Sequence, residues 1–192
     1  IAAATDQVAS SGGTVFTPPT SLGDRGKIAV VADPQGALFA LLQTANGDPA
    51  DTTEPASVGD FFWHELWTGD IDRAVTFYGK LAPYQMERRN LGTGNESIDY
   101  VVMQTQQQKR GGIRANPFKG LPPIWVNYLQ IPDDAELDRI LAKVESLGGE
   151  ILVPAASRPS GGTVAMIAGP SGAGIALQTW KNEEQLAKFG EQ

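Results

Sequence analysis

Apolar residues recur with two different periods along residues 60–180, and the two periods predict two kinds of element. Helical spacing covers 71–81 and again the stretch from 134 to 147, and an aspartate, Asp70 or Asp133, stands where each helix would begin. Paired glycines at 148–149 end the second helix. Runs of aromatic and β-branched residues bounded by turn residues predict strands. The predicted strands lie at 61–68, 84–90, 97–105, 111–115, 124–131, 150–153, 162–168 and 174–180.

The predicted order is strand, helix and three strands, followed by the same series again. Two such βαβββ modules predict an α+β fold in which helices cover only one face of each sheet. The other face is free to curve. We therefore expect paired modules that form a curved mixed sheet with a cleft.

An internal repeat relates the start of the chain to its end. Residues 12–41 match residues 148–177 without a gap, and twelve positions are identical where chance would give about two. The identical positions in the first copy are Gly12, Gly13, Pro18, Ser21, Gly26, Ala29, Ala32, Pro34, Gly36, Ala37, Ala40 and Leu41. A match of this length indicates a duplicated domain.

The repeat predicts the domain organisation. Residues 1–45 correspond to the C-terminal part of a first domain whose front half is absent, 46–59 form a Pro- and Gly-rich linker, 60–182 form a complete second domain, and 183–192 form a polar tail. We expect a missing N-terminal segment, or a second chain, to complete the first domain, because unpaired edge strands are usually covered. The alternative is a degenerate half-domain that pairs with the second unit.

Composition narrows the class of partner. The chain of 192 residues has a formal net charge of -7 and no basic stripe, so nucleic-acid binding is not expected. No apolar run is long enough to cross a membrane, and a cytoplasmic location is expected. The chain has no cysteine, which excludes disulfides, thiolate nucleophiles and Cys-based metal sites.

The stretch "ELWTGDIDRAVTFYGKL" from Glu65 to Leu81 resembles the strand-to-helix signature of the vicinal oxygen chelate superfamily. This superfamily includes glyoxalases, extradiol dioxygenases and bleomycin-resistance proteins. "LGGEILVP" and "GPSGAGIALQ" resemble its C-terminal module, and the duplication resembles bacterial tandem-domain glyoxalase-like proteins. The resemblance implies that residues 60–180 form one complete domain of this fold.

The resemblance also places the metal ligands of the family, which are His, Gln or Glu on the first and last strands of each module. Three of those positions hold Trp63, Val126 and Ala176, and Arg114 is the nearest residue to the fourth. None of these side chains binds a cation, and the chain has a single histidine. We expect no metal and no cofactor in this unit. A divalent metal is expected only if the intact protein completes a site.

Strand alternation predicts which side chains face the cleft. If Trp63 faces it, so do Glu65 and Trp67, while Phe62, His64 and Leu66 face the covering helix. His64 is then a packed structural histidine with a polar neighbour, unless a strand bulge exposes it.

On the cleft face we expect a ligand-binding set of Trp63, Trp67, Arg114, Tyr128 and Gln130, with Gln178 and either Tyr100 or Val101 close by. Desolvation among the tryptophans would raise the pKa of Glu65 and make it the candidate catalytic base. Alternatively, the tryptophans fill the core and Glu65 pairs with an arginine, such as Arg88, Arg89 or Arg114.

Three functions remain open at this point. The first is a metal-free glyoxalase-like protein that binds a small, partly aromatic or hydrophobic molecule. The second is a metal-dependent lyase, isomerase or dioxygenase whose site is completed by the missing segment. The third is a non-catalytic association domain. The sequence leaves open whether any reaction is catalysed.

Overall fold

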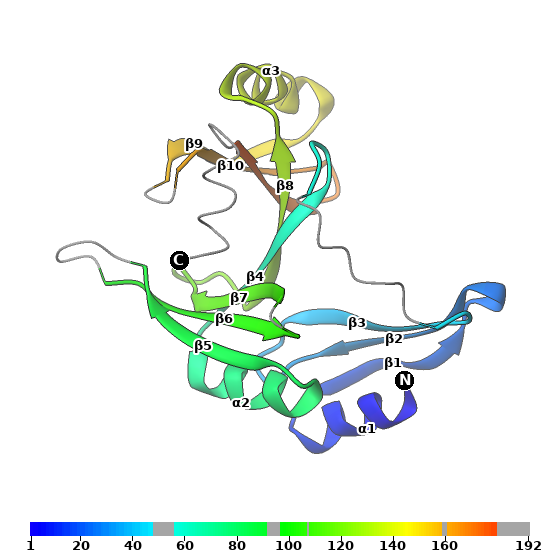
Figure 1. Cartoon of the computed structure of the whole chain (residues 1–192). Helices are drawn as coiled ribbons and strands as arrows, with labels where there is room; N and C mark the ends of the chain where they lie inside the picture. The colour runs from blue at the N-terminus through cyan, green and yellow to red at the C-terminus, as the bar shows by residue number, and fades with distance from the viewer. Residues whose placement is uncertain (48–55, 92–96, 107, 159–160, 180–192) are drawn as a thin grey trace. The chain divides into compact units, whose positions relative to one another are not determined.

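A computed structural model describes residues 1–47, 56–91, 97–106, 108–158 and 161–179 (Figure 1). The elements in chain order are α1 (Ala2–Ser10), β1 (Thr14–Ser21), the 3-10 turn η1 (Gly23–Arg25), β2 (Gly26–Ala32), β3 (Leu38–Thr44), β4 (Phe61–Thr68), α2 (Ile71–Leu81), β5 (Gln85–Asn90), β6 (Asp99–Thr105), β7 (Gln108–Ala115), β8 (Ile124–Ile131), α3 (Asp134–Val144), the 3-10 turn η2 (Glu145–Leu147), β9 (Glu150–Ser157), β10 (Thr163–Ala168) and β11 (Gly174–Thr179).

The predicted α+β class and the repeated order of strand, helix and three strands are confirmed. Strands β1, β2 and β3 form one sheet, and the other strands hydrogen-bond in the order β5-β6-β7-β4-β8-β11-β10-β9. This larger sheet is mixed, because β4 runs parallel to β7 and β8 runs parallel to β11. Two strands are longer than predicted. β7 starts at Gln108, where it pairs with Thr105 of β6, and β9 continues through Pro154, which an edge strand tolerates.

The chain divides into two compact units. The first consists of Ile1–Thr52 and Glu65–Trp125, and the second of Thr53–His64 and Val126–Gln192. Strand β4 therefore contributes residues to both. Part of the predicted linker (residues 48–55) and the whole predicted tail (183–192) lie outside the described residues.

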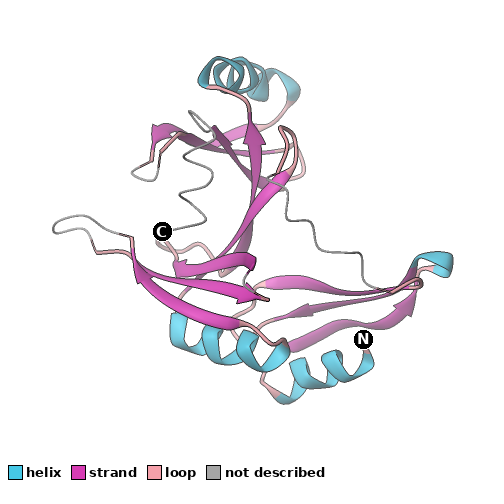
Figure 2. Cartoon of the chain, in the orientation of Figure 1, coloured by secondary structure: helices cyan, strands magenta, loops and turns pink. Residues whose placement is uncertain are grey.

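In the first unit, α1 lies against β1 and β2, and α2 lies against β5 and β7 (Figures 1 and 2). One hydrophobic core joins the residues of the first repeat copy to those of the following module. Its buried members are Val8, Ala29, Val31, Ala37, Leu66, Ala74, Phe77, Tyr78, Val101, Met103 and Ile113. Because α1 and α2 share this core, residues of the first repeat copy fold together with the module of β4–β7.

A buried polar chain connects three separate segments of this unit. The Asp33 carboxylate accepts hydrogen bonds through Oδ1 from the backbone N–H groups of Gln35, at 2.8 Å, and Ala37, at 3.0 Å. Its Oδ2 accepts from the Tyr78 hydroxyl at 3.2 Å. The Tyr78 oxygen in turn accepts from Nε1 of Trp125 at 3.1 Å. The Tyr78 hydroxyl of helix α2 thus connects two other segments. One is the turn after β2, which contains Asp33, and the other is the start of β8, which contains Trp125.

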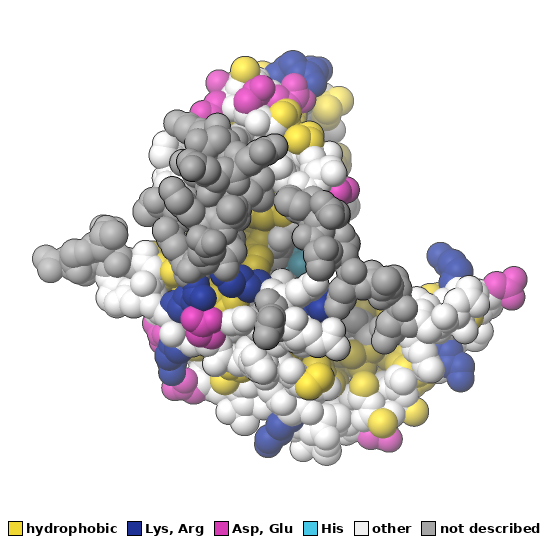
Figure 3. Space-filling view, viewed as in Figure 1, with side chains coloured by type: hydrophobic (Ala, Val, Ile, Leu, Met, Phe, Trp, Pro, Cys, Tyr) yellow, Lys and Arg dark blue, Asp and Glu magenta, His cyan; other side chains and the backbone are white. Residues whose placement is uncertain are grey.

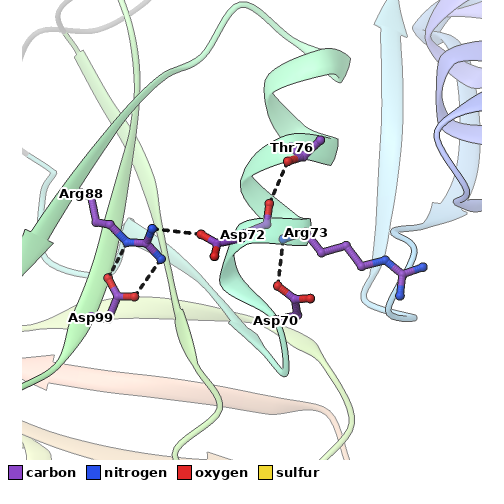
Figure 4. A network of polar contacts seen from close by, with 6 residues as sticks. All are labelled: Asp70, Asp72, Arg73, Thr76, Arg88 and Asp99. Carbon is purple, nitrogen blue, oxygen red and sulfur yellow. Dashed lines mark hydrogen bonds and ion pairs between the residues drawn. The ribbon is translucent and has the colours of Figure 1, made fainter.

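The start of α2 shows why this helix begins at Ile71. The Asp70 side chain accepts a hydrogen bond from the backbone N–H of Arg73 at 2.9 Å, which satisfies a free donor of the first turn (Figure 4). On the surface beside it, the Arg88 guanidinium forms an ion pair with Asp72 and donates two hydrogen bonds of 2.8 Å each to the Asp99 carboxylate. These bonds hold the pKa of Asp99 below its ordinary value.

In the second unit, α3 covers one face of the strands. Asp133 caps this helix as predicted, accepting from the backbone N–H of Glu136 at 2.7 Å. The core beneath α3 consists of Ile131, Leu137, Ala165 and Leu177. Acidic and basic side chains of α3 are mixed at the surface (Figure 3).

The two repeat copies share the same close contact between helix and strand. A Cβ atom on Gly13 would lie 2.5 Å from the carbonyl oxygen of Ala32, and one on Gly149 would lie 2.6 Å from that of Ala168. Each glycine donates its backbone N–H to the last turn of the preceding helix, at 2.9 Å in both copies. Only glycine fits at such an approach.

Replacing Tyr78 with phenylalanine tests the buried polar chain. Tyr78→Phe leaves Asp33 Oδ2 short of a donor and the Trp125 N–H without its acceptor, so the free energy of unfolding should fall by about 1–3 kcal/mol. Urea denaturation measures the change. Tyr84→Phe, which removes the hydroxyl of a half-buried tyrosine nearby, serves as the control and should cost less than about 0.5 kcal/mol.

The same pair of proteins gives a pH test. Burial and the nearby Asp33 carboxylate raise the pKa of Tyr78 above its ordinary value. The folded state therefore keeps this proton to higher pH than the unfolded state. The stabilisation is complete below a pH of about 10 and is lost as the pH rises further. The stability difference between wild type and Tyr78→Phe should narrow above that pH, and a difference that stays constant would contradict the assignment.

Candidate functional site

In the first unit, the sheet face opposite the core carries a cluster of polar and aromatic side chains. Leu66, Val101 and Ile113 point into the core, so their neighbours along each strand lie on the opposite face. The strand register places Glu65 beside Gly112 and Trp67 beside Arg114, with Tyr100 on the other side of Arg114. We call Glu65, Trp67, Tyr100, Gly112 and Arg114 the Glu65 cluster.

Glu65 is a buried carboxylate, with 2% of its surface exposed. Its Oε1 accepts a hydrogen bond from the Tyr100 hydroxyl at 2.9 Å, and its Oε2 accepts from Nε1 of Trp67 at 2.5 Å. Both donors are themselves buried, and the Trp67 ring contacts Phe118 with 5.6 Å between the ring centroids. These two hydrogen bonds fix the positions of both aromatic side chains.

The tyrosine reaches Glu65 because Gly112 lacks a side chain. A Cβ atom on Gly112 would lie 1.9 Å from the Tyr100 hydroxyl oxygen and 2.3 Å from the carbon that bears it. The Tyr100 ring therefore lies directly over Gly112. Strand alternation left open whether Tyr100 or Val101 faces the cleft, and Val101 instead lies in the core. The glycine in "GGIRA" is the signal in the sequence for the close approach of Tyr100.

Arg114 presents a polar group without a hydrogen-bond partner. Its side chain is half-buried, and its Nε atom is buried and makes no hydrogen bond within the described chain. A buried donor without an acceptor is costly and uncommon in proteins. The position next to Trp67 therefore favours a ligand that brings an oxygen atom to this nitrogen.

The remaining predicted ligand-binding residues belong to the second unit. Trp63 is buried, and Tyr128 and Gln130 lie on β8 with their side chains on the face opposite the α3 core. The Phe62 ring contacts the Tyr128 ring edge-on, with 6.2 Å between the centroids. The proposed arginine partners Arg88 and Arg89 instead pair with acidic residues of their own surface, Asp72, Asp99 and Glu87.

The prediction that His64 packs under a helix is wrong. His64 is exposed, and its Nδ1 lies 2.8 Å from Oδ1 of Asn127 on β8. The reason is that α2 covers β4 only from Leu66 onward, whereas His64 belongs to the part of the strand in the second unit. The predicted polar neighbour is therefore present, but on an exposed surface.

The donor set does not fit a family-type metal site. The positions that the resemblance assigns to ligands hold Trp63, Val126 and Ala176, none of which supplies a suitable donor atom. Among the residues that the structure describes, no group of three or more His, Asp or Glu side chains is arranged to hold a metal ion. We therefore derive no chemical step through a metal.

Comparison with known proteins finds relatives that are similar to this chain in sequence. The chain is 30% identical over 171 residues to CFP32, a candidate glyoxylase of Mycobacterium tuberculosis and Mycobacterium bovis, covering 89% of this chain and 62% of the relative. It is 30% identical over 180 residues to the anthracycline biosynthesis protein DauV of a Streptomyces species, covering 91% and 60%. The chain thus spans about three-fifths of the length of these relatives. No protein-family model matches it.

Solved structures share the fold. A 2,2',3-trihydroxybiphenyl 1,2-dioxygenase of Sphingomonas wittichii aligns over 93% of this chain and 65% of its own, with a TM-score of 0.56 and 19% identity. A Mn(II)-bound glyoxalase of Novosphingobium aromaticivorans aligns over 92% and 57%, with a TM-score of 0.56 and 17% identity. The chain is thus similar in sequence to a candidate glyoxylase, and it shares the fold of a dioxygenase and of a glyoxalase.

Along the described parts of the chain, no helix has the length and apolar character needed to cross a bilayer.

Replacing Gly112 with alanine tests the Glu65 cluster. The added methyl group must displace the Tyr100 ring and break its hydrogen bond to Glu65, so Gly112→Ala should lower the free energy of unfolding by about 1–3 kcal/mol. Chemical denaturation measures this loss. In a Tyr100→Ala background the same substitution should cost little, because the clash is gone. Equal costs in the two backgrounds would show that Tyr100 does not occupy the space over Gly112.

Proposed function

We propose that this glyoxalase-like chain binds a small, partly aromatic molecule at the Glu65 cluster and does so without a metal of its own. The observation that carries the proposal is the buried, unpaired Nε of Arg114 beside aromatic side chains. A planar ring with an oxygen substituent would pack on the aromatic groups and accept the arginine N–H.

The electrostatics of the cluster support a binding role. The two hydrogen bonds from Trp67 and Tyr100 hold Glu65 in place and, through it, fix the aromatic wall. A rigid wall loses little conformational freedom when a ligand binds. Glu65 as a catalytic base stays a prediction. Each oxygen accepts one of these hydrogen bonds and keeps a second lone pair, so the two contacts do not prevent the carboxylate from taking a proton.

The relatives support a small-molecule ligand. One is named a candidate glyoxylase and another an anthracycline biosynthesis protein, so proteins of this sequence group are associated with more than one class of small compound. This diversity agrees with a scaffold whose ligand is set by local side chains.

A matched pair of probes tests the binding site. We expect 2-naphthol to bind in isothermal titration, and 2-methylnaphthalene, which has the same shape without the oxygen, to bind about tenfold more weakly, since one unmet donor costs of the order of 1.4 kcal/mol. Arg114→Met keeps the apolar stem but removes the N–H groups, so it should weaken 2-naphthol binding by a similar factor and leave 2-methylnaphthalene binding unchanged.

The control for this substitution is Arg139→Met, because Arg139 is an exposed arginine of α3. It should not change the affinity for either probe. The proposal fails if Arg114→Met binds 2-naphthol as tightly as wild type does, or if neither probe binds the wild-type protein.

Metal independence has its own test. We expect the protein to retain far less than one equivalent of metal after purification, as measured by elemental analysis. Its melting temperature should not change with EDTA or with added Zn²⁺, Mn²⁺ or Ni²⁺, because a metal present at a hundred times its Kd would stabilise the fold by about 2.7 kcal/mol. A stoichiometric metal, or such a stabilisation, would favour the metal-dependent lyase or dioxygenase instead.

A further inference from the structure

Two buried glutamines lie side by side in the second unit. Gln178 of β11 and Gln130 of β8 are direct neighbours in the parallel strand register, with 0% and 8% of their surfaces exposed. The adjacent residues Leu177 and Ile131 point into the α3 core, so both amides lie on the opposite face.

Arg158 determines how the Gln178 amide is oriented. Its Nη1 lies 3.1 Å from Oε1 of Gln178, and a guanidinium can only donate, so the carbonyl oxygen of the amide must face the arginine. The guanidinium carbon lies 5.2 Å from the centre of the Tyr128 ring, which holds the arginine in a cation–π contact. The NH₂ group of Gln178 therefore points away from Arg158.

Each amide of the pair has one unmet group. Nε2 of Gln178 is buried and has no hydrogen-bond partner among the described residues, and the same holds for Oε1 of Gln130. Buried amide groups are nearly always satisfied, so two unmet groups on register neighbours call for an explanation. One of them is a donor and the other is an acceptor.

We infer that this glutamine pair is a binding subsite for a neutral amide or lactam. The edge of such a group presents a carbonyl oxygen next to an N–H. The oxygen would accept from Nε2 of Gln178, and the N–H would donate to Oε1 of Gln130. A carboxylate matches less well, because it can only accept and would face the Gln130 oxygen without a proton between them. The inference goes beyond the proposed function and uses no residue of the Glu65 cluster.

The test uses 2-pyridone as the probe and N-methyl-2-pyridone as its matched partner. N-methyl-2-pyridone carries a methyl group in place of the N–H that would donate to Gln130. We expect 2-pyridone to shift the side-chain amide signals of Gln178 in ¹⁵N NMR spectra of the whole chain, and N-methyl-2-pyridone to bind at least about tenfold more weakly.

Two substitutions locate the effect. Gln130→Met removes the acceptor, and Gln178→Glu removes the donor while keeping an oxygen for Arg158. Each should weaken 2-pyridone binding at least about tenfold. Gln85→Met, at an exposed position on β5, is the matched control and should change nothing. Far-UV circular dichroism and the backbone NMR spectrum establish that each variant is folded.

Several results would overturn the inference. Equal binding of the two pyridones would show that Gln130 does not accept a ligand proton. Tighter binding of benzoate than of 2-pyridone would indicate an anion site. Absence of any probe binding would mean that a buried water alone satisfies the two amides. Because the Arg114→Met test with 2-naphthol involves other residues, the two proposals can fail independently.

Discussion

The first compact unit depends on the hydrogen bonds that the buried carboxylate of Asp33 accepts. An ionised Asp33 without partners would cost several kcal/mol inside a protein. Two backbone N–H groups of its own turn and the Tyr78 hydroxyl supply the partners. Because Tyr78 also accepts from Trp125, the satisfaction of one charge fixes the turn, helix α2 and the chain entering β8 relative to one another. The hydrophobic core shared by α1 and α2 is built around this connection.

Glu65 follows the same principle with a different result. Here too a buried carboxylate is held by aromatic side chains, a tyrosine hydroxyl and a tryptophan N–H. These donors satisfy the oxygens without supplying an opposite charge. The Glu65 carboxylate therefore fixes the positions of Trp67 and Tyr100. The donor without a partner is Nε of the neighbouring Arg114. Within this unit, the group that organises the cluster and the group left to contact a ligand are different residues.

Much of the fold could be predicted because its signals are local. The caps at Asp70 and Asp133 and the alternation in the strands depend on residues a few positions apart, and the elements lie where these signals place them. The extended strands β7 and β9 were underestimated, because their ends are set by pairing with β6 and β10 rather than by composition.

The candidate site was less predictable. Strand parity placed Glu65 and Trp67 on one face with Trp63, but it could not show that Tyr100 bonds to Glu65. That contact spans 35 residues and depends on an absent side chain at Gly112. The prediction that His64 is packed under a helix was wrong for a related reason. Strand parity shows which face of the sheet a side chain lies on, but it does not show how far along the strand a helix covers that face. The pairing of Arg158 with Gln178 likewise leaves no periodic trace in the sequence.

The contact made by Gly13 and Gly149 explains why the two repeat copies share the same residue at this position. Of the twelve positions that the two copies share, most are glycine, alanine or proline, and Ala29 and Ala165 are both fully buried. A bulky apolar residue can be exchanged for another when its neighbours adjust. A position that touches a carbonyl oxygen has no such freedom, because any added atom collides. At this contact both copies are therefore limited to the residue that has no side chain.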